Sequence, residues 1–124
     1  MKKLIAFLLA FAMILCFASC AKKPTATIKV IDLEGNERYV IHVELKDGLT
    51  AGTALEEYLK ANNVEYELFD GDMISRIDDM QQDNELWTVY WGSYVNGEYA
   101  EVGLWAQTME DGDLIEIKLE EANW

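Results

Sequence analysis

Reactive side chains are scarce in this sequence, which contains only two cysteines and one histidine. No cysteine follows Cys20, so the rest of the chain can form no intrachain disulfide, CxxC redox pair or cysteine-based metal site. The single histidine, His42, lies in a stretch with the alternation of a strand, where a solvated side chain is expected. General acid–base and nucleophilic catalysis need a base placed against a second group. We therefore predict that the protein is not an enzyme and has no catalytic residues.

Oxygen-based metal sites are also not indicated. The sequence Asp-Gly-Asp occurs at Asp70 to Asp72 and again at Asp111 to Asp113, but neither copy continues into the regular ligand spacing of a calcium loop. Aspartate and glycine are favoured in sharp turns, which explains both copies. We predict no metal site and no required cofactor.

Positive charge is in short supply as well, since 10 Lys and Arg face 23 Asp and Glu, for a formal net charge of -13. So acidic a chain repels phosphate backbones and anionic lipid headgroups, which excludes nucleic acid as a partner. Two explanations of the acidic surface stay open: it keeps the protein soluble, or it attracts a cationic partner.

The first residues have the pattern of a secretory signal, with two lysines followed by an apolar run from Leu4 to Leu15. The sequence "FASC" resembles the bacterial lipoprotein signal, in which small residues precede a cysteine that becomes lipidated. We therefore predict a signal peptide at 1–19, lipid attachment at Cys20 and a tether at 20–26, about 20 to 25 Å long when extended. The protein would then be extracytoplasmic, anchored to the bacterial cell membrane by its lipid alone. Cleavage of an ordinary secreted protein near Ala18 or Ala21 is the alternative.

Hydrophobic periodicity predicts an α+β domain over residues 27–124. Alternating segments predict strands at 25–33, 38–45, 64–69, 73–77, 87–91 and 113–120. Between them, 48–63 changes to helical spacing, with Thr50 as N-cap, Thr53 to Glu56 as a capping box, and an end near Asn62 or Asn63. The order of elements predicts a β-grasp-like mixed sheet with one packed helix.

Aromatic residues gather between Leu86 and Trp105, in "LWTVYWGSYVNGEYAEVGLW", which holds three of the four tryptophans. Strand alternation places Trp87, Val89 and Trp91 on one side of the sheet. We predict that Trp87 belongs to the core and that Asn96-Gly97 forms a tight turn. One helix covers one face of a sheet and leaves the other open, so the remaining rings are either ordinary packing or a face for a partner.

Three segments, "GTALEEYL", "GSYVNGEYAEVG" and "MEDGDLIEIKL", together resemble the small β-grasp domain that closes transcobalamin and intrinsic factor. The resemblance spans nearly the whole chain after the signal peptide. It implies binding of cobalamin or another corrinoid, a large flat ring with an amide-rich edge. On this resemblance the ligand-binding residues are Trp91, Ser93, Tyr94, Asn96, Tyr99 and Trp105.

Two functional hypotheses follow. In the first, the protein captures a cobalamin-type corrinoid or similar small molecule for a membrane uptake transporter, or together with a second binding subunit, because the vitamin carriers enclose their ligand with an additional helical domain. In the second, it is a surface interaction module that binds a protein, peptide or cell-wall polymer through an aromatic sheet face. Saturable binding of a small molecule by the isolated domain distinguishes them.

Overall fold

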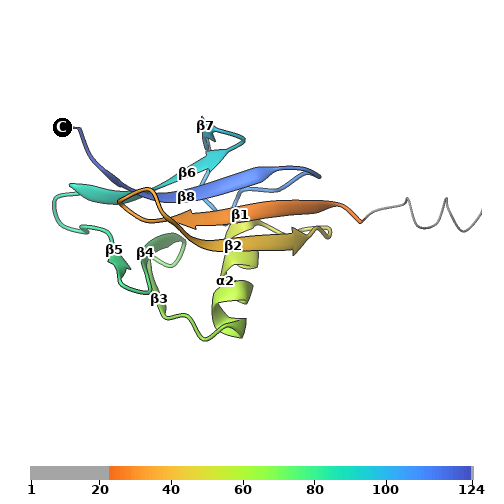
Figure 1. Cartoon of the computed structure of the whole chain (residues 1–124), viewed down its shortest axis with the longest axis horizontal. Coiled ribbons are helices and arrows are strands. Elements are labelled where there is room, and N and C mark those ends of the chain that lie inside the picture. Colours follow the sequence, from red (N-terminus) through yellow and green to blue (C-terminus); the bar gives the residue numbers. More distant parts are fainter. Residues whose placement is uncertain (1–22, 124) are drawn as a thin grey trace, which may run out of the picture.

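The computed structural model describes residues 23–123, so the predicted signal peptide and the predicted lipid attachment at Cys20 lie outside the described residues. Its larger sheet has five strands: β1 (Thr25–Ile31), β2 (Glu37–Glu44), β6 (Val89–Val95), β7 (Glu98–Tyr99) and β8 (Leu114–Glu121). Their spatial order is β2-β1-β8-β6-β7 (Figure 1). The β1–β8 pair is parallel and the other pairs are antiparallel, so the predicted mixed sheet is confirmed.

The helix α2 (Ala51–Ala61) forms where the sequence predicted it. Its N-cap is Thr50, whose side chain accepts a hydrogen bond from the backbone N–H of Thr53. The helix ends at the C-cap Asn62, whose N–H bonds back to the Tyr58 carbonyl at 3.0 Å. Glu56 does not take part in the cap, and its carboxylate instead contacts residues distant in the sequence.

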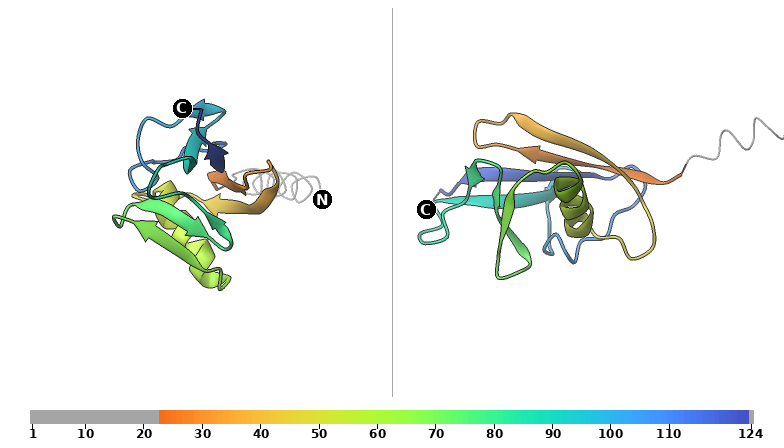
Figure 2. Two further views of the ribbon diagram at one scale, coloured as in Figure 1. Left: turned by 90° about the vertical axis from the view of Figure 1, so that its left-hand side faces the viewer. Right: turned by 90° about the horizontal axis from the view of Figure 1, so that it is seen from below.

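A second sheet was not predicted. It consists of three short antiparallel strands, β3 (Tyr66–Phe69), β4 (Met73–Ile77) and β5 (Met80–Gln81), in sequential order. This sheet and α2 lie on the same side of the five-stranded sheet (Figures 1 and 2). The molecule is therefore an α+β domain in which the helix shares its layer with a small sheet. Within residues 23–123 there is no helix long and apolar enough to cross a lipid bilayer.

The core lies between these two layers and follows the alternation of the strands. The five-stranded sheet contributes alternate residues of β1, β2 and β8, the helix contributes one apolar stripe, and β4 contributes two isoleucines. The largest fully buried side chains are Ile28, Val30, Leu55, Leu59, Ile77, Ile115 and Ile117. Strand β1 begins at Thr25, as the predicted strand at 25–33 did, and Ala26 is buried in it, so the predicted tether at 20–26 overlaps the fold by two residues. All elements and the core lie between Thr25 and Glu121, so a form comprising residues 21–124 retains the whole folded unit.

The prediction that Trp87 belongs to the core is wrong. Strand β6 begins at Val89, and Trp87 lies in the preceding loop with a left-handed backbone (φ 57). That conformation breaks the alternation expected from "WTVYW", so Trp87 does not share the orientation of Trp91. Its half-buried ring packs edge-on against Phe69 of β3 at 5.5 Å between centroids.

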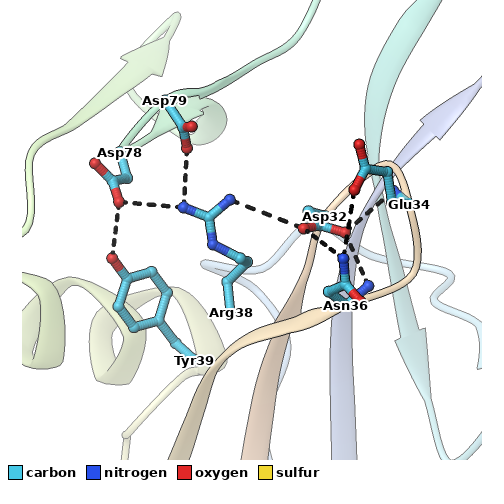
Figure 3. Close-up of polar contacts among 7 residues, drawn as sticks. All are labelled: Asp32, Glu34, Asn36, Arg38, Tyr39, Asp78 and Asp79. Atoms are coloured by element: carbon cyan, nitrogen blue, oxygen red, sulfur yellow. Dashed lines mark hydrogen bonds and ion pairs between the residues drawn. The ribbon is translucent and has the colours of Figure 1, made fainter.

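Arg38 joins the two sheets on the side of the β1–β2 turn (Figure 3). Its guanidinium contacts Asp79 at 3.0 Å and Asp78 at 3.4 Å in the turn after β4, and Asp32 at 3.8 Å after β1. The Tyr39 hydroxyl donates to Asp78 at 3.2 Å. The carboxylates raise the pKa of Arg38, with the hydrogen bond to Asp79 as the main cause. The charge of Arg38 is therefore already compensated within the fold.

Candidate ligand-binding site

A cavity of about 290 Å³ opens where β6, the start of β4 and the segment after β7 meet. Trp91 and Ser93 project into it from the helix side of β6, since residues two apart in a strand share a face. Tyr99 lines it from β7, and Ile74 and Met73 line it from β4. The segment that follows β7 completes the wall with Ala100, Glu101, Val102, Gly103 and Leu104. Three of the predicted ligand residues, Trp91, Ser93 and Tyr99, are thus brought together.

Trp91 is fixed in place by the smaller sheet. Its indole N–H donates to the Ser75 carbonyl of β4 at 3.1 Å, and its backbone N–H reaches the Gln82 side chain at 3.4 Å. The ring also packs against the buried core. Because the polar atom of the indole already has a partner, Trp91 offers the cavity an apolar ring surface in one orientation.

The cavity wall after β7 is held by the N-terminus of α2. The backbone N–H groups of Ala51 and Gly52 donate to the carbonyls of Gln107 and Leu104, each at 2.9 Å. These are helix N–H groups without an intrahelical acceptor, and the loop supplies one for each. Leu104, which lines the cavity, is buried at 7% exposure. The wall is therefore positioned by the helix, although it is irregular backbone.

Trp105 lies outside the cavity, next to Leu104. Its ring covers Gly52 of α2 so closely that a side chain at this glycine would collide with it. Its indole N–H donates to the Glu56 carboxylate at 2.9 Å, and the other oxygen of that carboxylate accepts from the Tyr66 hydroxyl at 2.6 Å. The latter bond raises the pKa of Tyr66 to about 12. In this structure Trp105 anchors the loop to the helix.

Tyr94 lies on the opposite face of β6 from Trp91. Its hydroxyl contacts both Glu120 carboxylate oxygens, at 2.7 and 2.9 Å, and this hydrogen bond raises the pKa of Tyr94 to about 12. The Lys118 ammonium lies 4.8 Å from the Tyr94 ring centre, and Tyr99 packs edge-on against that ring at 5.6 Å. Tyr99 is the register partner of Tyr94, so its ring lies on this same face of the sheet, away from the face that carries Trp91 and Ser93. Tyr99 therefore borders the cavity without turning its ring toward Trp91, and Tyr94 does not line the cavity.

Asn96 uses its side chain within the fold. With Gly97 it forms the β6–β7 turn, and both residues have positive φ angles, 51 and 87, the combination typical of a two-residue hairpin loop. The Asn96 amide donates to Asp113 at 2.9 Å and accepts from the N–H of Leu114 at 2.8 Å. These contacts connect the hairpin to β8 and use the polar side-chain atoms of Asn96 that were predicted to bind a ligand.

Acidic side chains stand at the rim of the cavity. Asp72 and Glu101 both line it and both are exposed. The interior is apolar and aromatic, with Ser93 as its hydroxyl group. The cavity can therefore hold an apolar or flat group whose polar edge faces outward. Asp72 lies in the first Asp-Gly-Asp motif and Leu104 in the aromatic stretch, but neither was predicted to be a ligand-binding residue.

Among residues 23–123, no group of three or more metal-binding side chains is present. The second Asp-Gly-Asp sequence acts as a turn, where Asp111 accepts from the N–H of Thr25 at 2.9 Å and Asp113 from that of Glu110 at 2.8 Å. His42 lies on β2 and does not line the cavity.

The mixed sheet, the packed helix and the aromatic cavity define a β-grasp-like α+β domain with a single candidate ligand site of this kind in the described part of the chain. The chain belongs to the family described as "domain of unknown function (DUF4430)", whose model matches residues 48–121. No curated protein matches the sequence.

Similar folds occur in solved structures, of which two are described. A "putative metal binding protein" from Ruminococcus gnavus ATCC 29149 superposes with a TM-score of 0.57 and 24% identity, over 82% of this chain and 99% of that one. Haptocorrin in complex with Cbi superposes with a TM-score of 0.65 and 18% identity, over 79% of this chain. The match spans 25% of haptocorrin, so this chain is similar to one part of a larger protein. The resemblance of the sequence to the transcobalamin type of domain is thereby confirmed at the level of the fold.

Proposed function

We propose that this protein is an extracytoplasmic, lipid-anchored binding protein that captures a cobalamin-type corrinoid. The observation that carries the proposal is the meeting of Trp91, Ser93 and Tyr99 in one cavity, on a fold shared with haptocorrin in complex with Cbi. A flat ring can lie against Trp91 and the apolar side chains of Ile74 and Val102, while its amides meet Ser93 and the backbone of the segment after β7.

The size of the cavity supports a role for a second protein. Its volume of about 290 Å³ lies at the lower end of ligand pockets, which measure roughly 300 to 1,000 Å³. A corrinoid is too large to be enclosed in this space, so most of the ligand would stay outside the domain. We propose that a membrane transporter or a second binding subunit covers the exposed part.

The position of the domain supports a partner at the membrane. Strand β1 begins at Thr25, and lipid attachment at Cys20 would leave a five-residue connection, about 16 to 18 Å when extended. A domain on so short a connection would stay next to membrane proteins. Binding without catalysis is the simplest role, because the chain's one histidine does not line the cavity.

Calorimetric titration of residues 21–124 with cobalamin and with cobinamide tests the proposal. We expect saturable binding that Trp91→Phe weakens, because the indole is the largest ring that β6 turns toward the cavity. Tyr99→Ala should change the binding little, because the Tyr99 ring packs against Tyr94 on the other face of the sheet. A matched pair of variants controls for surface hydrophobicity. Val102→Ala removes two methyl groups from the cavity wall, and Val40→Ala makes the same change on β2, at similar exposures of 47% and 41%.

Weaker binding for Val102→Ala with unchanged binding for Val40→Ala would support the cavity as the site. Equal effects of the two changes would contradict that assignment. No heat of binding with either corrinoid, with or without detergent-solubilised membrane proteins from the same cell, would favour the alternative of an interaction module.

A further inference from the structure

Strand β2 forms one edge of the five-stranded sheet and is paired on one side only, with β1 (Figure 2). In an antiparallel pair, alternate residues direct both backbone groups to the same side. The N–H of Leu45 donates to the Pro24 carbonyl at 2.9 Å, which sets the alternation for the preceding residues. It follows that Val40, His42 and Glu44 direct their N–H and C=O groups away from the sheet. Within residues 23–123 no other strand takes up these groups.

A groove of about 410 Å³ runs beside this free edge, between β2 and α2. Its base and helix wall are largely apolar, formed by Ile41, Val43, Leu45, Leu49, Ala54 and Tyr58. Ile41, Val43, Leu49 and Ala54 are buried, so this surface is fixed by the core. The groove thus combines a row of free backbone groups with a rigid apolar wall.

We propose that this groove binds an extended, positively charged peptide segment that adds to β2 as a further strand. Peptides that extend a sheet in this way gain affinity from backbone hydrogen bonds and specificity from alternate side chains. Here every second side chain of the peptide would enter the space against Leu49 and Tyr58. The stretch from Val40 to Leu45 accommodates a peptide of about six residues, or roughly 20 Å.

The negative charge of the protein favours a cationic peptide in the groove. The chain has a formal net charge of -13, so a second copy adding to the same edge would bring two strongly negative bodies together. Glu44 and Glu57 line the groove together with Lys46, and the Lys23 ammonium lies 4.0 Å from the Glu44 carboxylate. Both side chains of that pair are largely exposed, at 77% and 72%, so the pair is weak and Glu44 can still attract a cation. Arg38, at the start of β2, is already ion-paired with Asp78 and Asp79. A cationic strand therefore gains attraction, and an anionic one meets repulsion.

Two capped hexapeptides provide the test, one of alternating lysine and valine and one of alternating glutamate and valine. Amide exchange of residues 21–124 is followed by NMR with each peptide. With the lysine peptide we expect exchange at Val40, His42 and Glu44 to slow by about tenfold at saturation. The N–H groups of Ile41 and Val43 face β1, so their exchange should not change. The glutamate peptide should have no effect.

Variants separate backbone pairing from charge. Val40→Pro deletes one outward N–H without removing a bond to β1, so it should reduce binding of the lysine peptide, whereas Val40→Thr, which keeps the N–H, should not. Glu57→Lys changes an exposed helix residue and should weaken lysine-peptide binding by roughly threefold to tenfold.

Three results would overturn the proposal. One is the absence of saturable binding by the lysine peptide. Another is binding that leaves exchange at Val40, His42 and Glu44 unchanged. The third is self-association of the protein that Val40→Pro abolishes, because it would assign the edge to a second copy. None of these results bears on corrinoid binding, since no residue of the groove lines the cavity at β6.

Discussion

We expect replacement of Glu56 by alanine to lower the stability of the domain markedly, although the Glu56 side chain is partly exposed. It joins α2 to two segments distant in the sequence, through hydrogen bonds from the Trp105 indole at 2.9 Å and the Tyr66 hydroxyl at 2.6 Å. A hydrogen bond to a charged group contributes about 1.5 to 3 kcal/mol. The Glu56 side chain is 21% exposed, so the lower value applies to each bond.

The expected cost of Glu56→Ala follows from these terms. The loss of the two hydrogen bonds lowers the free energy of unfolding by about 3 kcal/mol, and the loss of the exposed ion pair with Lys60 lowers it by about 0.3 kcal/mol more. The better helix propensity of alanine raises it by about 0.5 kcal/mol. The net loss in free energy of unfolding is about 2.5 to 3 kcal/mol. For a domain of this size the midpoint of thermal unfolding should fall by roughly 10 to 20 °C.

Urea unfolding of residues 21–124, followed by tryptophan fluorescence, measures the effect. A double-mutant cycle with Tyr66→Phe, which deletes one donor and little else, isolates the Tyr66–Glu56 bond. We expect a coupling energy of about 1 to 1.5 kcal/mol. Effects of the two changes that add within about 0.5 kcal/mol would refute the reasoning, because independent sites add in this way.

Three further predictions concern other contacts. The pKa of Tyr94 is raised from 10 to about 12 in the folded protein, so ultraviolet titration of tyrosinate should show a late phase, which Glu120→Gln should move to lower pH. The stability that the Tyr94 hydrogen bond contributes is complete below pH 10 and is lost as the pH rises toward 12. Gly52→Ala should cost about 1 to 3 kcal/mol in urea unfolding, because its methyl group collides with the Trp105 ring, and an undiminished stability would contradict the close packing seen here. Arg38→Met should cost no more than about 1 kcal/mol, an effect that disappears in 1 M salt if its exposed ion pairs are the cause.

The local patterns of the sequence predicted most elements of the fold. The helix was predictable because its apolar spacing and the cap at Thr50 agree, and the Asn96-Gly97 turn because both residues tolerate positive φ. The second sheet was not, although two of its strands were expected, because alternation within a strand does not say which strand it pairs with. The prediction for Trp87 was wrong because the alternating sequence pattern does not reveal that its backbone is left-handed.

The candidate site was predictable only in part, for a similar reason. The aromatic stretch contains Trp91, Ser93 and Tyr99, which line one cavity in the structure. Tyr94 alternates to the other face of the same strand, and Trp105 faces the helix, because partners distant in the sequence satisfy their polar atoms. Leu104 was not predicted because its place in the cavity wall depends on the loop conformation, which hydrogen bonds from the N-terminus of α2 fix.

The parallel pairing of β1 with β8 places the first and last strands side by side in the middle of the large sheet. Until β8 is available, β1 and β2 form an isolated hairpin, and β6 has no neighbour that connects it to them. Bringing such distant segments together costs loop-closure entropy before their contacts stabilise the fold, so we expect this topology to fold late and comparatively slowly. A chain shortened before Leu114 should not merely lose one strand; it should fail to acquire a cooperative fold. If the protein is exported, this delay keeps the emerging chain unfolded, and therefore able to cross the membrane, until its last residues have been made.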